Sequence, residues 1–121
     1  MHIRSLSGCQ EFVAGDGSVL RELLNAATEK SPFRYSLAHA VVKAGKATVP
    51  HSLKTSEVYY MLSGKGIMHI DSEAVEVSPG DAVSIPPESV QYIENKEDMD
   101  LVFLCIVDPA WRKEDEIILP R

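Results

Sequence analysis

Three side chains near the middle of this 121-residue chain can move a proton: His51, Glu57 and Tyr59. An imidazole and a carboxyl group that share a buried pocket can act as an acid–base pair. Burial would raise the pKa of the Glu57 carboxyl, because its charged form loses solvation there. In a strand, Tyr59 would share the face of Glu57 and could donate its phenol proton to a substrate. The alternative is a core tyrosine with its hydroxyl at the mouth of the pocket.

The sequence contains no pattern typical of a nucleotide-binding site or of a nucleophilic catalytic site. The chain has no nucleotide-binding glycine pattern, no nucleophile in a triad and no thiol with a clear histidine partner. Cys9 and Cys105 are far apart and lack CxxC spacing, so we expect two free thiols. His39 lies inside an apolar segment and is expected at the surface or hydrogen-bonded, although it could reach inward as a ligand. His69 is expected to face solvent.

The composition indicates the partners that the protein does not have. The formal net charge is −6, and no basic stripe is present that could neutralise phosphates, so we expect no nucleic-acid partner. An acidic surface is also poorly matched to anionic lipid. No apolar run approaches the roughly 20 residues that span a bilayer, and no secretory signal is evident. We therefore expect a cytoplasmic protein.

Short apolar segments separated by turn signals indicate an all-β domain. They recur at roughly 8–12-residue spacing, which is typical of a sandwich or closed barrel. The length suits a single domain, with residues 1–34 as an N-terminal arm or edge segment packed on a barrel of residues 35–121. The predicted strands are residues 35–42, 57–62, 67–70, 74–77, 82–85, 90–93 and 101–107.

Two segments, one near each end of the chain, lack a clear strand pattern. Residues 18–28 are compatible with a helix capped by Ser18 or with an extended arm paired to the edge of the barrel. Residues 109–115 predict a short helical turn, on which Trp111 would be a packing lid. Whichever conformation residues 18–28 adopt, the Gly-Asp-Gly sequence before them is a turn signal.

Residues 45–64 resemble the first motif of the cupin superfamily. That motif is Gly, five residues, His, one residue, His, three or four residues, Glu, six residues and Gly. Here Gly45, His51, Glu57 and Gly64 fall at the expected positions. The position of the second histidine is occupied by Leu53.

Residues 80–95 resemble the second cupin motif. Its pattern is Gly, five residues, Pro, one residue, Gly, two residues, His, three residues and Asn. Gly80, Pro86 and Asn95 match, whereas Glu88 replaces the inner glycine and Gln91 replaces the histidine. The resemblance implies a cupin-type double-stranded β-helix, which is a jelly-roll barrel, with an N-terminal arm and a short C-terminal helical turn.

The resemblance also implies where a metal ion would bind. A typical cupin holds one divalent ion at the positions occupied here by His51, Leu53, Glu57 and Gln91, and two of these four are changed. Leucine cannot ligate a metal, and an amide offers only a neutral oxygen. A site of His51, Glu57 and Gln91 suits Lewis-acid chemistry better than oxygen activation. Two expectations stay open: one divalent ion (Zn, Mn or Fe), or no metal.

The functional expectation is a cupin that binds a small molecule. Its pocket would be lined by Thr48, Leu53 and Gln91 beside the three proton-transferring side chains. It could be an isomerase or lyase acting on a small polar organic substrate. The alternatives are a non-catalytic ligand-binding or sensory domain, and a structural domain whose interior is filled by side chains.

The expected assembly is a homodimer. The resemblance implies it, because single-domain cupins are commonly dimers. The segment around Glu57 supports it, since Val58 and Tyr60 would point away from the barrel interior and are also largely apolar. A strand that is apolar on both faces suggests that both faces are covered.

Overall fold

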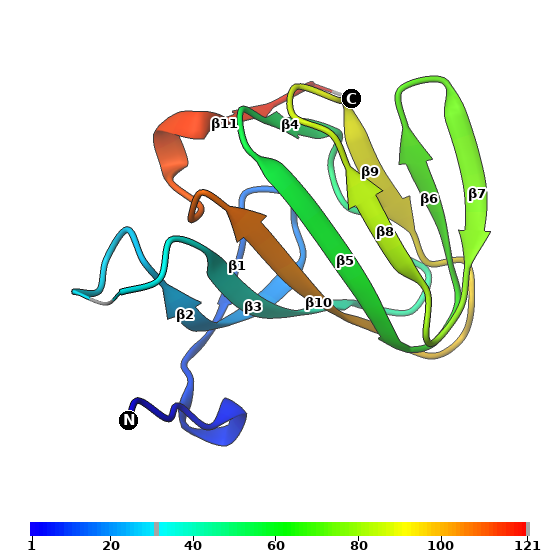
Figure 1. Cartoon of the computed structure of the whole chain (residues 1–121). Helices are drawn as coiled ribbons and strands as arrows, with labels where there is room; N and C mark the ends of the chain where they lie inside the picture. Colours follow the sequence, from blue (N-terminus) through cyan, green and yellow to red (C-terminus); the bar gives the residue numbers. More distant parts are fainter. Residues whose placement is uncertain (31, 121) are drawn as a thin grey trace.

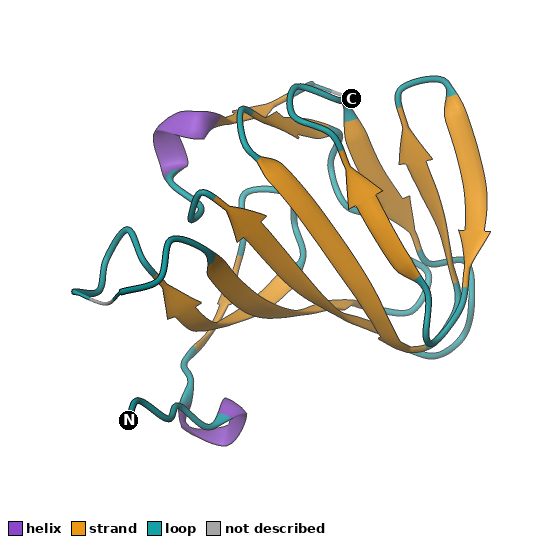
Figure 2. Ribbon diagram, viewed as in Figure 1, coloured by secondary structure: helices purple, strands orange, loops and turns teal. Residues whose placement is uncertain are grey.

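The computed structural model of the protein describes residues 1–30 and 32–120. Two antiparallel sheets face each other, and short turns join their strands (Figure 1 and Figure 2). This is the all-β barrel that the sequence predicts. In the described residues, helical structure is limited to two short 3-10 turns, η1 (Leu6–Gly8) and η2 (Lys113–Asp115). No helix in that part of the chain is long and apolar enough to cross a membrane.

The two sheets differ in size. The larger has the strand order β1-β2-β3-β10-β5-β8, and the smaller has the order β11-β4-β9-β6-β7. The larger sheet consists of β1 (Glu11–Val13), β2 (Val19–Asn25), β3 (Ser36–Val42), β10 (Leu101–Asp108), β5 (Ser56–Ser63) and β8 (Ala82–Ile85). The smaller sheet consists of β11 (Glu116–Ile118), β4 (His51–Leu53), β9 (Gln91–Glu94), β6 (Gly66–Ile70) and β7 (Glu73–Val77).

Residues 18–28 do not form the helix that was one of the two expectations. Strand β2 pairs along β3, with Val19 opposite Val41 and Asn25 opposite Ser36. Six of the seven residues of this strand pair with β3, and those long-range contacts outweigh the local helical pattern. The extended-arm alternative is therefore confirmed.

Each strand predicted from residue 35 onward is present, but the prediction missed three short strands. These are β1, β4 and β11, each of three residues. Three-residue segments carry too little alternation to be recognised by pattern. The expected C-terminal turn is confirmed as η2, and the chain then continues into β11. That strand pairs with β4 and places Glu116 opposite Leu53 and Ile118 opposite His51.

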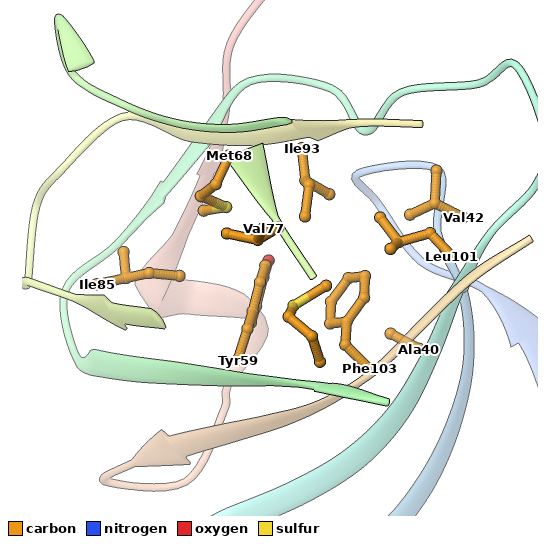
Figure 3. Packing of buried hydrophobic residues seen from close by; sticks show 10 residues of the cluster. Ala40, Val42, Tyr59, Met68, Val77, Ile85, Ile93, Leu101 and Phe103 are labelled. Carbon is orange, nitrogen blue, oxygen red and sulfur yellow. The ribbon is translucent and has the colours of Figure 1, made fainter. Parts of the chain in front are cut away.

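The core lies between the two sheets. Tyr59, Met61 and Phe103 from the larger sheet are each at most 3% exposed, as are Met68 and Ile93 from the smaller sheet. Figure 3 shows the rings of Tyr59 and Phe103 side by side, with Met68 and Ile93 facing them from the opposite sheet. The two ring centroids are 4.4 Å apart. Such aromatic pairs add stabilisation beyond their buried area.

Gly64 shows why one motif position requires glycine. Its φ is +81°, a conformation that other residues resist. A Cβ atom there would lie 2.6 Å from the carbonyl oxygen of Asp100, so the loop after β5 can approach β10 only with a glycine at this position.

Strand β5 alternates as predicted. Glu57, Tyr59 and Met61 are buried, whereas Tyr60 and Leu62 are each 42% exposed on the outer face of the larger sheet. Ile106 of β10, which is 38% exposed, lies beside Val58 on that face. The outer face of the β5–β10 pair is therefore apolar.

Candidate functional site

A cavity of about 490 Å³ lies between the sheets. Its wall takes side chains from both sheets, from the 14–18 loop and from the segment around η2. Most of the wall is apolar, and its polar members converge from distant parts of the sequence. These polar members include Asp16, His51, Glu57, Tyr59 and Glu116.

Glu57 is held by a chain of hydrogen bonds. The amide nitrogen of Gln91 donates to Glu57 Oε1 at 2.9 Å, and the hydroxyl of Tyr59 donates to Gln91 Oε1 at 3.0 Å. The three side chains come from β5 and β9, and they are 7%, 1% and 3% exposed for Glu57, Gln91 and Tyr59. Because Gln91 bonds at both ends of its amide, it fixes the orientation of the Glu57 carboxyl.

Burial strongly disfavours ionisation of Glu57. It raises the pKa of Glu57 from the ordinary 4.5 to about 8, an effect that the hydrogen bond from Gln91 partly opposes. The negative charges of Asp16 and Glu116 raise this pKa further. Burial also raises the pKa of Tyr59 well above its ordinary value, with Glu57 as a second cause. At neutral pH Glu57 therefore carries a proton, and Tyr59 remains a hydrogen-bond donor.

His51 begins strand β4 and presents one ring nitrogen to the cavity. Its Nδ1 lies 2.8 Å from the carbonyl oxygen of Val49, which can only accept, so Nδ1 carries a hydrogen. In the neutral ring the lone pair is then on Nε2, which lies 3.8 Å from Asp16 Oδ2. The side chain of His51 is 3% exposed. His51 is therefore oriented to accept a proton within the cavity.

Asp16 is positioned by the turn between β1 and β2. Its Oδ1 accepts hydrogen bonds from the backbone nitrogen of Ser18 at 3.0 Å and from the Ser18 hydroxyl at 2.6 Å. The backbone nitrogen of Val49 donates to the carbonyl oxygen of Asp16 at 2.7 Å, which joins this turn to the segment before β4. Oδ2 therefore faces His51, and Asp16 can stabilise the protonated ring.

Glu116 of β11 is a further carboxyl group of the wall. Its Oε2 lies 3.4 Å from the indole nitrogen of Trp111, which donates to it. Burial raises the pKa of Glu116, an effect opposed by His51 and by the hydrogen bond from Trp111 and reinforced by Asp16. Trp111 is half-buried in the wall, so the expected lid residue forms part of the cavity.

The structure separates the predicted site residues into two groups. His51, Glu57 and Tyr59 line the cavity, whereas Thr48, Leu53 and Gln91 are absent from its wall. The hydroxyl of Thr48 accepts a hydrogen bond from the backbone of Ile93 at 2.9 Å. Leu53 is buried in β4, and Gln91 lies behind Glu57. These three residues are buried outside the cavity.

Sequence reasoning missed Asp16 and Glu116. Asp16 stands in a recognised turn signal, and a serine two residues later is typical of a local Asp–backbone hydrogen bond. That signal could have indicated an oriented carboxylate, although not its neighbour His51. Glu116 had no local signal, because only the pairing of β11 with β4 brings it to the cavity.

The residues expected to bind a metal do not fit one in this arrangement. Gln91 directs its amide nitrogen, not its oxygen, at Glu57, and its oxygen is bonded to Tyr59. A shared metal would require the opposite orientation of the amide and would break both bonds. Within residues 1–30 and 32–120, no group of three or more His, Cys, Asp or Glu side chains could hold a metal ion.

The two cysteines and two further histidines lie at different distances from the cavity. Cys9 and Cys105 are free thiols, as expected. Cys105 lines the cavity, and burial followed by the charge of Glu57 raises its pKa, so it stays a thiol. His39 lies opposite Arg21 on β2 and does not line the cavity. His69 is half-buried, stacked on Tyr92 and 2.6 Å from Glu94, so it is less open to solvent than expected.

Comparison with known proteins places this barrel among related sequences and structures. The family model for the cupin domain matches residues 38–107. The uncharacterized protein MJ1618 of Methanocaldococcus jannaschii is 41% identical over 109 residues, which are 89% of this chain and 86% of that protein.

Solved structures share the fold. The plu4264 protein of Photorhabdus luminescens is 25% identical, with a TM-score of 0.76 over 93% of this chain and 89% of that one. Pac13, a nucleoside dehydratase of Streptomyces, is 19% identical, with a TM-score of 0.75 over 98% of this chain and 91% of that one. At 19% identity, the likeness to Pac13 concerns the fold alone.

The raised pKa of Glu57 predicts a specific loss of stability with pH. The unfolded chain releases the Glu57 proton near pH 4.5, whereas the folded chain retains it to about pH 8. Between these values the free energy of unfolding should fall, relative to a Glu57→Gln variant, by on the order of 4 to 5 kcal/mol. Denaturant unfolding of both proteins from pH 4 to 9 measures this difference.

The matched control is Glu73→Gln, at an exposed position of β7. Its free energy of unfolding should follow that of the unaltered protein across the whole pH range. A constant difference between the unaltered protein and Glu57→Gln would contradict the assignment of a protonated Glu57.

Proposed function

Because this chain belongs to the cupin family, we propose that its barrel is an enzyme of the isomerase or lyase type that acts on a small organic molecule. The observation that carries the proposal is the placement of Glu57. One oxygen of its carboxyl group is held by Gln91, and the group lines a cavity that also contains the free ring nitrogen of His51. A protonated acid and an imidazole base in one pocket are the components of proton-transfer catalysis.

The proposed reaction uses the two groups in turn. His51 Nε2 takes a proton from a carbon next to a carbonyl group of the substrate, and the electron pair of that C–H bond moves towards the carbonyl. Glu57 gives its proton to the carbonyl oxygen in an isomerisation, or to a departing hydroxyl, which leaves as water, in an elimination. Asp16 Oδ2, 3.8 Å from the ring, stabilises the imidazolium that forms.

Gln91 and Tyr59 are positioning residues in this proposal. Their hydrogen bonds leave Glu57 Oε1 as an acceptor, so the carboxyl proton resides on Oε2, the atom available to the substrate. The orientation does not change when Glu57 loses its proton, because Gln91 can donate to either form. Holding the acid in place in this way reduces the reorganisation needed during the reaction.

The volume of the cavity helps to distinguish the proposed enzyme from a purely structural domain. A volume of about 490 Å³ lies in the range of small-molecule sites, which argues against a barrel filled by its own side chains. Pac13 has the same fold, so a lyase is compatible with this barrel. A non-catalytic ligand-binding or sensory domain differs from the proposed enzyme only in what happens to the bound molecule.

Hydrogen–deuterium exchange at carbon tests the proposed chemistry. A panel of hydroxy ketones, aldoses, amino sugars and nucleosides is incubated with the protein in D2O and followed by NMR. We expect deuterium incorporation or loss of water for at least one compound. Glu57→Gln and His51→Asn should each reduce the rate at least 100-fold, because each removes one proton-transfer group. A chelator should leave the rate unchanged.

Far-UV circular dichroism checks that both variants are folded, and Glu73→Gln, away from the cavity, should retain the full rate. Full exchange activity in folded Glu57→Gln would rule the mechanism out. Binding of panel compounds without exchange would assign the protein to the non-catalytic alternative.

We also propose that the apolar outer face of β5 and β10 is the interface of a homodimer. Tyr60, Leu62 and Ile106 are exposed there, and an apolar patch of this kind is typical of protein interfaces. Light scattering coupled to size-exclusion chromatography at micromolar concentration should give twice the mass of the 13.3 kDa chain. Tyr60→Glu should give a folded monomer, and Val75→Glu, exposed on β7, should stay dimeric. A monomeric unaltered protein would overturn this proposal.

A further inference from the structure

We infer that the substrate of this cavity carries a positively charged ammonium group on an apolar or aromatic body. The inference rests on the proposed function only in taking the cavity as the site of a small organic molecule. It is carried by the charges of the wall, by the ring nitrogen Nε2 of the buried His51, which makes no hydrogen bond among the described residues, and by the aromatic side chains that line the cavity.

The charged side chains of the wall are predominantly acidic. Besides Glu57, which carries a proton at neutral pH, the acidic residues are Asp16, Glu22 and Glu116, whereas the lysine and arginine side chains that the described wall contains are limited to Lys113. Lys113 is exposed in η2, where water solvates it. Asp16 is 8% exposed, so its charge is screened less than a charge at the surface. A cation inside the cavity therefore meets a favourable field.

The ring nitrogen Nε2 of His51 has no hydrogen-bond donor or acceptor within bonding distance among the described residues. His51 bonds through Nδ1, and the 3.8 Å from its Nε2 to Asp16 Oδ2 is too long for a hydrogen bond. The His51 side chain is more than nine-tenths buried and lines the cavity. Buried polar atoms are normally satisfied, so a ligand that donates hydrogen bonds is expected here.

The aromatic wall favours an organic cation over a metal ion. Phe12, Tyr59, Phe103 and Trp111 line the cavity, and the indole of Trp111 is hydrogen-bonded to the Glu116 carboxylate. Aromatic rings beside carboxylates recognise ammonium groups through cation–π and ionic attraction together. A volume of about 490 Å³ is also far larger than a single ion needs. An anionic substrate would instead lose its hydration facing like charges.

Three probes of nearly equal size test the inference on the intact protein: benzylammonium, benzyl alcohol and benzoate. Titrations at pH 7, followed by ligand-observed NMR and calorimetry, compare their dissociation constants. We expect benzylammonium to bind at least tenfold more tightly than benzyl alcohol, and benzoate to bind more weakly than both. Equal binding of the ammonium and the alcohol, or tighter binding of benzoate, would overturn the inference.

Variants of the acidic wall residues test which carboxyl groups produce the preference for benzylammonium. Asp16→Asn retains the Oδ1 acceptor for Ser18 and removes the charge, and Glu116→Gln retains the acceptor for Trp111. Each should weaken benzylammonium binding at least fivefold and leave benzyl alcohol unchanged. Glu73→Gln, at an exposed position outside the cavity, is the matched control and should change neither probe. An unchanged preference for the ammonium in both cavity variants would overturn the inference.

This experiment and the exchange assay fail independently. Selective ammonium binding without exchange of any amine-bearing compound would contradict the proposed enzyme and support the inferred ligand class. Exchange of neutral sugars or nucleosides, with no preference for benzylammonium, would do the reverse. Saturation of the site by zinc or manganese ions in competition with benzylammonium would replace the organic cation by a metal and overturn the inference.

Discussion

A carboxyl group buried between two sheets must be neutral or well bonded, and the arrangement of this site follows from how Glu57 meets that requirement. Gln91 donates to it, and Tyr59 fixes Gln91 by donating to the other end of the amide. The hydrogen bonds run from Tyr59 through Gln91 to Glu57 Oε1. They fix the carboxyl group and leave its second oxygen, Oε2, available to a ligand in the cavity. The same bonds turn the Gln91 oxygen away from Glu57, so these two side chains do not present oxygen ligands to a shared metal ion.

The remaining polar groups reach the cavity through the topology of the barrel. His51 lies opposite Gln91 in the pairing of β4 with β9, so imidazole and carboxyl share one end of the barrel. Asp16 and Glu116 come from near the two ends of the described chain, through the β1–β2 turn and the pairing of β11 with β4. The acid Glu57, the base His51 and the carboxyl groups of Asp16 and Glu116 therefore come from separate elements of the fold. The proposed proton transfer and the proposed preference for a cation both depend on this convergence of side chains.

Much of the fold and part of the site could be predicted from local pattern. Alternation along β5 placed Glu57 and Tyr59 inward correctly, because one face of that strand is packed on the core. Pattern could not decide residues 18–28, where pairing with β3 outweighs a helix-like arrangement of leucines. Nor could it find Asp16 and Glu116, whose role depends on contacts between distant segments. Gln91 was expected to face a ligand, but its amide has both of its partners inside the protein.

The central claim is that Glu57 is a protonated acid at neutral pH, held by Gln91. A pH titration of the side-chain carboxyl carbons by ¹³C NMR, with the Glu57 signal assigned by its absence from Glu57→Gln, tests it most directly. We expect a midpoint for Glu57 at about pH 8. A midpoint near the ordinary value of 4.5 would show that the carboxyl is ionised in the folded protein and would contradict the account.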